Sequence, residues 1–98
     1  MLQGKVVIVT GAGNGVGADI ARLAAKYGAK VVINDAGVTS AGEGRDPTVA
    51  KRMTDEIVAA GGEAIASVRN VADWDDAHGI IQDAIDAYGK IDVVVNNA

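Results

Sequence analysis

Four short runs of β-branched and alanine residues alternate with three longer segments of helical periodicity, and this alternation constrains the fold more than any other feature. The short runs lie at residues 5–9, 30–34, 63–68 and 91–95. Apolar runs of this length are typical of strands buried on both faces of a parallel sheet. The alternation therefore predicts one α/β domain over residues 1–98, with parallel strands and right-handed crossovers.

The helical segments have recognisable ends and apolar faces. In the first helix, the expected buried face consists of Val16, Ile20, Leu23, Ala24 and Tyr27. Pro47 is favoured in the first turn of the second helix, and Asp73 is the expected N-cap of the third. A doubly wound sheet built from such units has the strand order 3-2-1-4, with the first two helices on one face. Its fourth strand forms an open apolar edge, which invites pairing with another chain.

A glycine-rich stretch, TGAGNGVG at residues 10–17, follows the first apolar run. Glycine adopts positive φ, lets backbone N–H groups approach phosphate oxygens, and here precedes a helix N-terminus, which attracts anions. Two spacings fit dinucleotide binding, namely Gly11-x-x-x-Gly15-x-Gly17 and Gly13-x-Gly15-x-x-Ala18. We favour the first, because it begins where the strand ends. No lysine follows at the offset that a P-loop requires.

Asp35 ends the second apolar run, about 18 residues after Gly17, where a carboxylate is expected to accept hydrogen bonds from the adenosine ribose. This carboxylate would repel a 2′-phosphate, and the glycine stretch contains no Arg or Lys that would attract one. The sequence therefore predicts NAD as the cofactor rather than NADP. In the alternative interpretation, Asp35 only begins a turn.

Three motifs, TGAGNGVG at 10–17, NDAG at 34–37 and NNA at 96–98, together resemble the N-terminal half of the short-chain dehydrogenase/reductase family. The resemblance implies a Rossmann-like, doubly wound parallel sheet that binds a dinucleotide. It assigns the phosphates to Gly11, Asn14, Gly15, Val16 and Gly17, the ribose to Asp35, the adenine to Asn70 and Val71, and the cofactor cleft to Asn96 and Ala98. Asn70 stands where the family has aspartate, so its amide oxygen would accept from the adenine amino group.

The resemblance also extends to the reaction. The family's catalytic serine and Tyr-x-x-x-Lys pair are not found here, since Tyr27 is followed four residues later by Val31 and Tyr88 by Asp92. We therefore expect the NAD-binding half of an enzyme that transfers hydride between NAD and an alcohol or ketone. The long segment after Asp35 is similar to the hydroxyacyl-CoA and hydroxysteroid dehydrogenase branch.

Two alternatives stay open at this point. One is a module that binds NAD or an adenine nucleotide without turnover. The other is a half-Rossmann unit that pairs with itself, as a homo-oligomer, or with a complementary C-terminal half. Titration with NAD, NADP and AMP distinguishes the binding module from the pairing unit.

Composition excludes several other classes of protein. The formal charge is −4 and both signs are spread along the chain, so nucleic acid and anionic membranes are not expected partners. The sequence contains no cysteine, which excludes disulfides and thiolate metal sites and fits the cytoplasm. No apolar run approaches the roughly 20 residues of a membrane-spanning helix.

Overall fold

The computed structural model of the chain describes residues 1–36 and 47–97. The glycine-rich segment at 37–46 and Ala98, which the sequence assigned to the cofactor cleft, lie outside the described residues. Among the described residues, no helix is long and apolar enough to cross a membrane.

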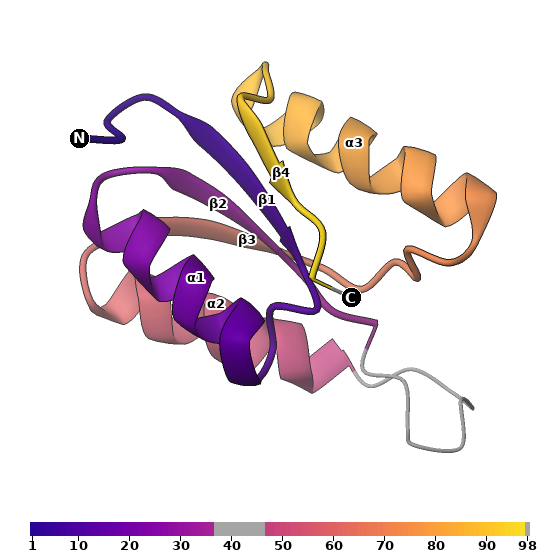
Figure 1. Cartoon of the computed structure of the whole chain (residues 1–98), viewed down its shortest axis with the longest axis horizontal. Helices are drawn as coiled ribbons and strands as arrows, with labels where there is room; N and C mark the ends of the chain where they lie inside the picture. The colour runs from indigo at the N-terminus through magenta and orange to yellow at the C-terminus, as the bar shows by residue number, and fades with distance from the viewer. Residues whose placement is uncertain (37–46, 98) are drawn as a thin grey trace.

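The described elements follow the expected β-α-β-α-β-α-β order (Figure 1). They are β1 (Val6–Thr10), α1 (Gly15–Lys26), β2 (Lys30–Asn34), α2 (Pro47–Ala59), β3 (Glu63–Ser67), α3 (Trp74–Tyr88) and β4 (Val93–Val95). The predicted N-cap is confirmed, because the Asp73 carboxylate accepts from the Asp76 N–H at 3.0 Å. Pro47 opens α2 as expected, whereas β4 begins two residues later than its apolar run.

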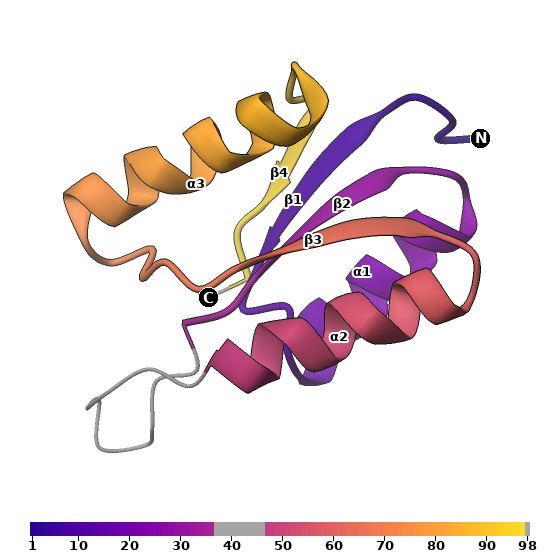
Figure 2. The ribbon, with the colours of Figure 1, turned by 180° about the vertical axis from the view of Figure 1, so that it is seen from behind.

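The four strands form one parallel sheet in the order β3-β2-β1-β4, which confirms the predicted doubly wound topology. In the central pair, Val6 lies opposite Lys30 and Thr10 lies opposite Asn34. Figures 1 and 2 show that the carboxyl ends of the strands converge near the loop before α1 and the C-terminal end of the chain. Ligands bind at this end of such sheets.

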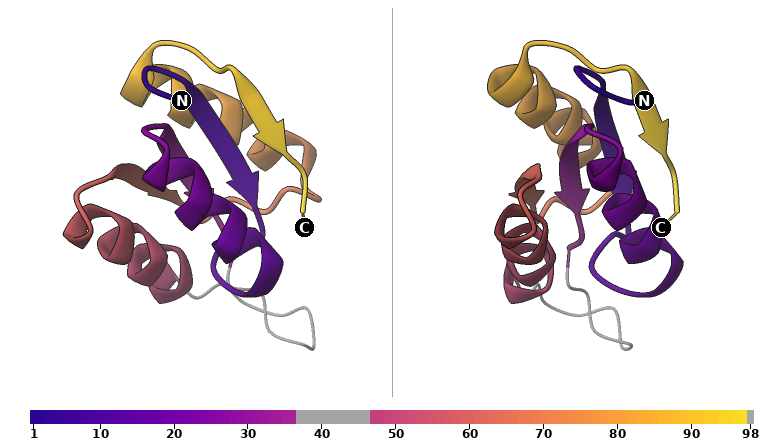
Figure 3. Two further views of the ribbon diagram at one scale, coloured as in Figure 1. Left: turned by 60° about the vertical axis from the view of Figure 1, so that its left-hand side comes forward. Right: turned by 90° about the vertical axis from the view of Figure 1, so that its left-hand side faces the viewer.

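The helices cover the two faces of the sheet unequally, as Figure 3 shows. On one face, Val7, Val9, Val31 and Ile33 pack with residues of α1 and α2. On the other face, Ile8 and Val32 pack with Ile80 and Ala84 of α3. Successive strand residues point to opposite faces, so one β-branched run supplies both cores.

The predicted buried face of α1 is largely wrong. The side that faces the sheet consists of small residues, namely Gly17, Ala18, Ala21 and Ala24. Val16 is 66% exposed and Leu23 is 55% exposed. Small residues let the helix axis lie close to β1 and the glycine loop, whereas the larger side chains would hold it away.

At the sheet edge, β4 presents apolar surface to the outside. Val93 is 43% exposed and Val94 is 51% exposed, although β4 pairs with β1 on its other side. The Asp92 carboxylate accepts the Val6 N–H at 2.8 Å, which fixes the entry into β4. The prediction of an apolar edge is therefore confirmed.

Candidate nucleotide-binding site

The loop between β1 and α1 requires glycine at two positions for conformational reasons. Gly11 has a φ of 62° and Gly15 has a φ of 59°, which lie in the left-handed region that L-residues with a Cβ rarely adopt. These two residues turn the chain from the end of β1 into the first turn of α1.

Close packing requires glycine at two more positions, one in the same loop and one in the first turn of α1. A Cβ at Gly17 would lie 2.6 Å from Asn97 Nδ2 and 2.9 Å from the carbonyl carbon of Gly11. A Cβ at Gly13 would lie 2.7 Å from the Asp35 Oδ2 atom and would overlap the Val49 side chain. Neighbouring side chains fill the space that a Cβ would need at Gly13, and the Gly11 backbone together with Asn97 fills it at Gly17.

The first turn of α1 is left without a side-chain cap. Asn14 is the N-cap residue, with φ −146° and ψ 166°, but its side chain makes no capping hydrogen bond. Asparagine is among the best N-capping residues, so its failure to cap leaves backbone N–H groups at the helix start for another acceptor. The positive end of the helix dipole lies at the same place. This loop is thus chemically suited to an anion such as a phosphate.

Asp35 lies beside this loop and is bonded to it. Its Oδ2 atom accepts the Gly13 N–H at 3.0 Å, and its own N–H donates to the Ser67 carbonyl at 2.9 Å. The carboxylate is therefore held between the glycine loop and the end of β3. A carboxylate has about four lone-pair sites, so it can accept several hydrogen bonds at once.

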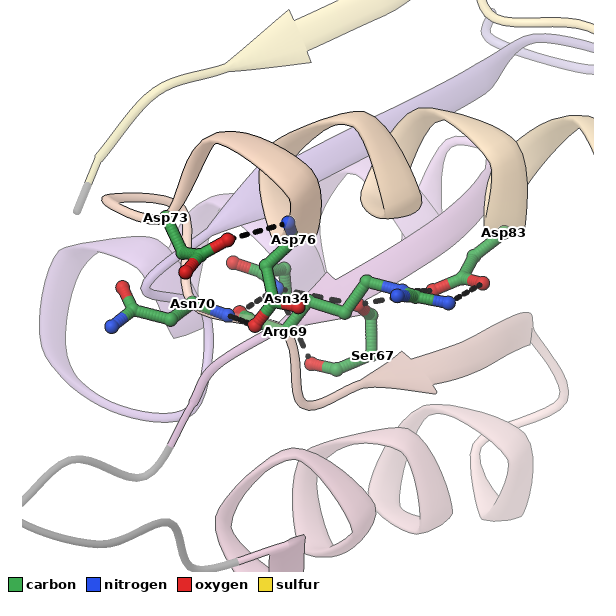
Figure 4. Close-up of polar contacts among 7 residues, drawn as sticks. All are labelled: Asn34, Ser67, Arg69, Asn70, Asp73, Asp76 and Asp83. Atoms are coloured by element: carbon green, nitrogen blue, oxygen red, sulfur yellow. Dashed lines mark hydrogen bonds and ion pairs between the residues drawn. The ribbon is translucent and has the colours of Figure 1, made fainter.

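A polar network holds the ends of β2 and β3 together (Figure 4). Asn34 is only 2% exposed, and its Nδ2 donates to the Arg69 carbonyl at 2.9 Å and to Ser67 Oγ at 3.3 Å. The Arg69 guanidinium turns along α3 and forms an ion pair with Asp83, with Nε 2.8 Å from Oδ2. Hydrogen bonding to this carboxylate raises the pKa of Arg69.

This network positions the residues assigned to the adenine. The Asn70 N–H donates to Asp76 Oδ2 at 2.9 Å, while Asn70 Oδ1 accepts the Ala72 N–H at 3.0 Å. The amide oxygen therefore accepts one hydrogen bond within the chain, and its second lone pair can accept one from a ligand amino group. A hollow of about 190 Å³ lies here, lined by Gly11, Asn34, Asp35, Ala36, Arg69, Asn70 and Val71.

The segment after β4 closes the site from the other side. Thr10 Oγ1 donates to Asn96 Oδ1 at 3.2 Å and accepts the Asn97 N–H at 2.9 Å. Asn97 Nδ2 then donates to the Gly11 carbonyl at 3.4 Å. Asn96 thus contacts Thr10, whereas Asn97 is the asparagine that reaches the glycine loop.

The structure brings together all the assigned site residues that it describes, from Gly11 to Asn96, at one end of the sheet. Thr10 and Asn97 belong to the TGAGNGVG and NNA motifs, but the sequence prediction gave neither of them a role in the site. The prediction also did not include Arg52 of α2, whose Nη2 lies 3.5 Å from Asn14 Oδ1. These two residues are 38 positions apart, and no local pattern indicates the contact.

Comparison with known proteins agrees with this arrangement. Residues 5–98 match the family described as short chain dehydrogenase. The chain belongs to the short chain dehydrogenase family. It is 47% identical over 96 residues to peroxisomal multifunctional enzyme type 2 of Drosophila melanogaster, covering 98% of this chain and 16% of that enzyme.

Solved short chain dehydrogenases share the fold as well as the sequence. A short chain dehydrogenase from Mycobacterium avium superposes with a TM-score of 0.87 at 52% identity, over 99% of this chain and 35% of that one. A metagenomic short-chain oxidoreductase in complex with NADP superposes with a TM-score of 0.82 at 38% identity, over 99% of this chain and 40% of that one. The chain therefore spans well under half the length of these relatives.

Proposed function

We propose that this chain is the NAD-binding part of a dehydrogenase that transfers hydride between NAD and an alcohol or ketone. The observation that carries the proposal is the uncapped start of α1 beside the Asp35 carboxylate. Donors for a diphosphate and an acceptor for ribose hydroxyls then lie next to each other. Neither Gly13 nor Gly17 has room for a Cβ, as expected where the backbone lies close to its neighbours.

Each part of the cofactor has residues that suit it. The diphosphate would bind to backbone N–H groups at Asn14, Gly15 and Val16, and the adenosine ribose to Asp35. The adenine would enter the hollow beside Asn70 and Val71. When bound, the nicotinamide supplies the hydride-transfer chemistry, while the residues of this chain bind and orient the cofactor.

The preference for NAD depends on Asp35. A carboxylate that faces the ribose accepts its hydroxyl groups, whereas it repels a 2′-phosphate. Because one solved relative is a complex with NADP, the family alone does not decide between the two cofactors. Asp35 is the reason to propose NAD.

The substrate and the compartment are further proposals. The likeness to solved hydroxysteroid dehydrogenases supports a hydroxysteroid substrate, and the long segment after Asp35 favours a hydroxyacyl substrate as the alternative. A tyrosine elsewhere in the whole enzyme would act on either as acid or base. The cytoplasmic location predicted from the composition also stays a proposal, and imaging of the tagged protein would test it.

Titration calorimetry of the chain with NAD, NADP and AMP tests the binding function. The chain should bind NAD more tightly than NADP, and Asp35→Ala should weaken NAD binding about tenfold, because a charge-assisted hydrogen bond is lost. Asp55→Ala on α2 is the matched control, since it removes the same charge from an exposed position. Absence of NAD binding would overturn the proposal, and unchanged affinity of Asp35→Ala would overturn the ribose role.

The open edge of β4 supports a second function, namely pairing with further polypeptide. Val93 and Val94 expose apolar surface on opposite faces of the sheet, and β4 has a strand on one side only. We propose that the remainder of a dehydrogenase, or a second copy of this chain, covers this edge. Light scattering should show association that Val94→Lys disrupts, whereas a monomeric wild-type chain at high concentration would contradict pairing with itself.

A further inference from the structure

A closed ring of three hydrogen bonds joins Asn70 to the first turn of α3. The Asn70 N–H donates to Asp76 Oδ2 at 2.9 Å, and the Asp76 N–H donates to Asp73 Oδ1 at 3.0 Å (Figure 4). The Asp73 N–H closes the ring, because it donates to the Asn70 carbonyl at 3.0 Å. Both backbone polar groups of Asn70 are therefore bonded to the start of one helix.

The ring differs from the usual way in which a helix start is capped. Asp73 is the N-cap, so Asp76 occupies the N3 position, whose side chain in a capping box accepts the N-cap N–H. Here the N-cap N–H donates to the Asn70 carbonyl, and the N3 carboxylate accepts the Asn70 N–H. The capping arrangement thus reaches back beyond the helix to the segment that lines the hollow.

Asp76 itself does not line that hollow. Asn70 and Val71 are among the described residues that do, whereas Asp76 is half-buried behind them in α3. Any effect of Asp76 on a ligand in the hollow must therefore pass through Asn70. Asp76 is in this respect a positioning residue and not a ligand-binding one.

The side chain of Asn70 is oriented as well as its backbone. Its Oδ1 atom accepts the Ala72 N–H at 3.0 Å, and because a backbone N–H can only donate, this bond identifies the oxygen end of the amide. The preceding residue, Arg69, is also held, since its carbonyl accepts from Asn34 Nδ2 at 2.9 Å and its guanidinium pairs with Asp83. Asn70 is thus fixed from both sides.

We propose that Asp76, by holding Asn70, makes the base subsite prefer adenine, which carries a 6-amino group, over hypoxanthine, which carries an oxygen there. The inference rests on the dinucleotide site proposed above. The second lone pair of Asn70 Oδ1 accepts from an amino group, whereas it would face another acceptor if the base carried oxygen. This preference requires that the amide cannot turn to present its nitrogen, and the ring restricts that turn.

Calorimetric titration with NAD and with nicotinamide hypoxanthine dinucleotide, which has oxygen in place of the 6-amino group, tests the proposal. The wild-type chain should bind NAD about fivefold more tightly, the value of one hydrogen bond. Asp76→Ala should remove most of this preference, and Asp76→Asn, which keeps an oxygen acceptor for the Asn70 N–H, should retain it. Asp75→Ala is the matched control, since it removes the same charge from an exposed position in the same turn and should retain the preference.

Amide hydrogen exchange of the wild-type chain is a second test, which holds even if Asp76→Ala does not fold. Coupling between two sites is reciprocal, so a base that binds through Asn70 stabilises the ring that holds Asn70. NAD at saturation should therefore slow exchange of the Asn70 and Asp76 N–H groups more than the hypoxanthine dinucleotide does. Equal slowing by the two dinucleotides would overturn the proposal.

The other outcomes of the titration are equally decisive. Equal weakening of both dinucleotides by Asp76→Ala would make Asp76 a purely structural residue, and loss of the preference in Asp76→Asn would assign the effect to charge. Tighter binding of the hypoxanthine dinucleotide by the wild-type chain would mean that Asn70 presents its nitrogen. Each of these results overturns the proposal. Equal binding of the two dinucleotides would refute the base preference alone, whereas a wild-type chain that binds neither would refute the dinucleotide site itself.

Discussion

Replacing Gly17 by alanine tests the close packing of α1 on the glycine loop. Gly17 lies within α1 and has no positive φ, so the conformation of the backbone does not by itself require glycine there. An alanine Cβ would lie 2.9 Å from the Gly11 carbonyl carbon and still closer to its oxygen. Because the obstacle is backbone, it can move only if the loop or the helix moves.

The expected magnitude is the difference between two opposing effects. Alanine favours a helix interior by about 1 kcal/mol relative to glycine. Overpacking a close contact costs about 1–3 kcal/mol, and a contact with backbone belongs at the upper end. We therefore expect Gly17→Ala to lower the free energy of unfolding by about 2 kcal/mol.

Gly79→Ala in α3 is the matched control, because its Cβ would meet only the tip of a side chain. The Arg69 Nε atom would lie 2.6 Å away, and the Arg69 side chain is 40% exposed, so it can move toward solvent if its ion pair with Asp83 breaks. The helix-propensity gain should offset the loss of a half-exposed ion pair, so stability should be unchanged or slightly higher. Urea denaturation followed by circular dichroism measures both variants. If Gly17→Ala is as stable as Gly79→Ala, the close-packing argument is refuted.

Two further predictions concern the termini of α3 and β4. Asp73→Ala should lower the free energy of unfolding by about 1 kcal/mol, because the N-cap bond to Asp76 is lost, and Asp75→Ala should have a smaller effect. The hydrogen bond from the Val6 N–H lowers the pKa of Asp92, so its stabilising contribution is complete above the ordinary carboxyl range and is lost as the pH falls through the lowered value. Asp92→Asn should therefore lose less stability on acidification than the wild-type chain, as measured by urea titrations at neutral and acid pH. An equal loss in both proteins would show that the bond is unimportant.

The topology could be predicted because several independent signals agreed. The apolar runs, Pro47, Asp73 and the glycine loop each indicated the same element order, and the strand order follows from that order in doubly wound sheets. Asp35 could be proposed as a ribose-binding residue because it follows a buried strand at its carboxyl end. Strand ends, helix caps and tight turns depend on a few neighbouring residues, so they can be predicted from short stretches of sequence.

The buried face of α1 could not be predicted, because two apolar stripes overlap on the helix. Hydrophobicity favoured Leu23, whereas the approach of α1 to β1 selected Ala18 and Ala21 for their small size. Periodicity reports which positions share a face but not how close the neighbouring sheet lies. The contact between Arg52 and Asn14 could not be predicted for a related reason, because it depends on how α2 packs against the loop.

The bond between Asp35 and Gly13 means that the carboxylate proposed to select the sugar also anchors a turn. A substitution at position 35 that removes the acceptor would therefore also release the loop proposed to bind the diphosphate. Redesign for NADP should therefore keep an oxygen acceptor at position 35, and asparagine is the natural choice because it removes the charge but can still accept the Gly13 N–H.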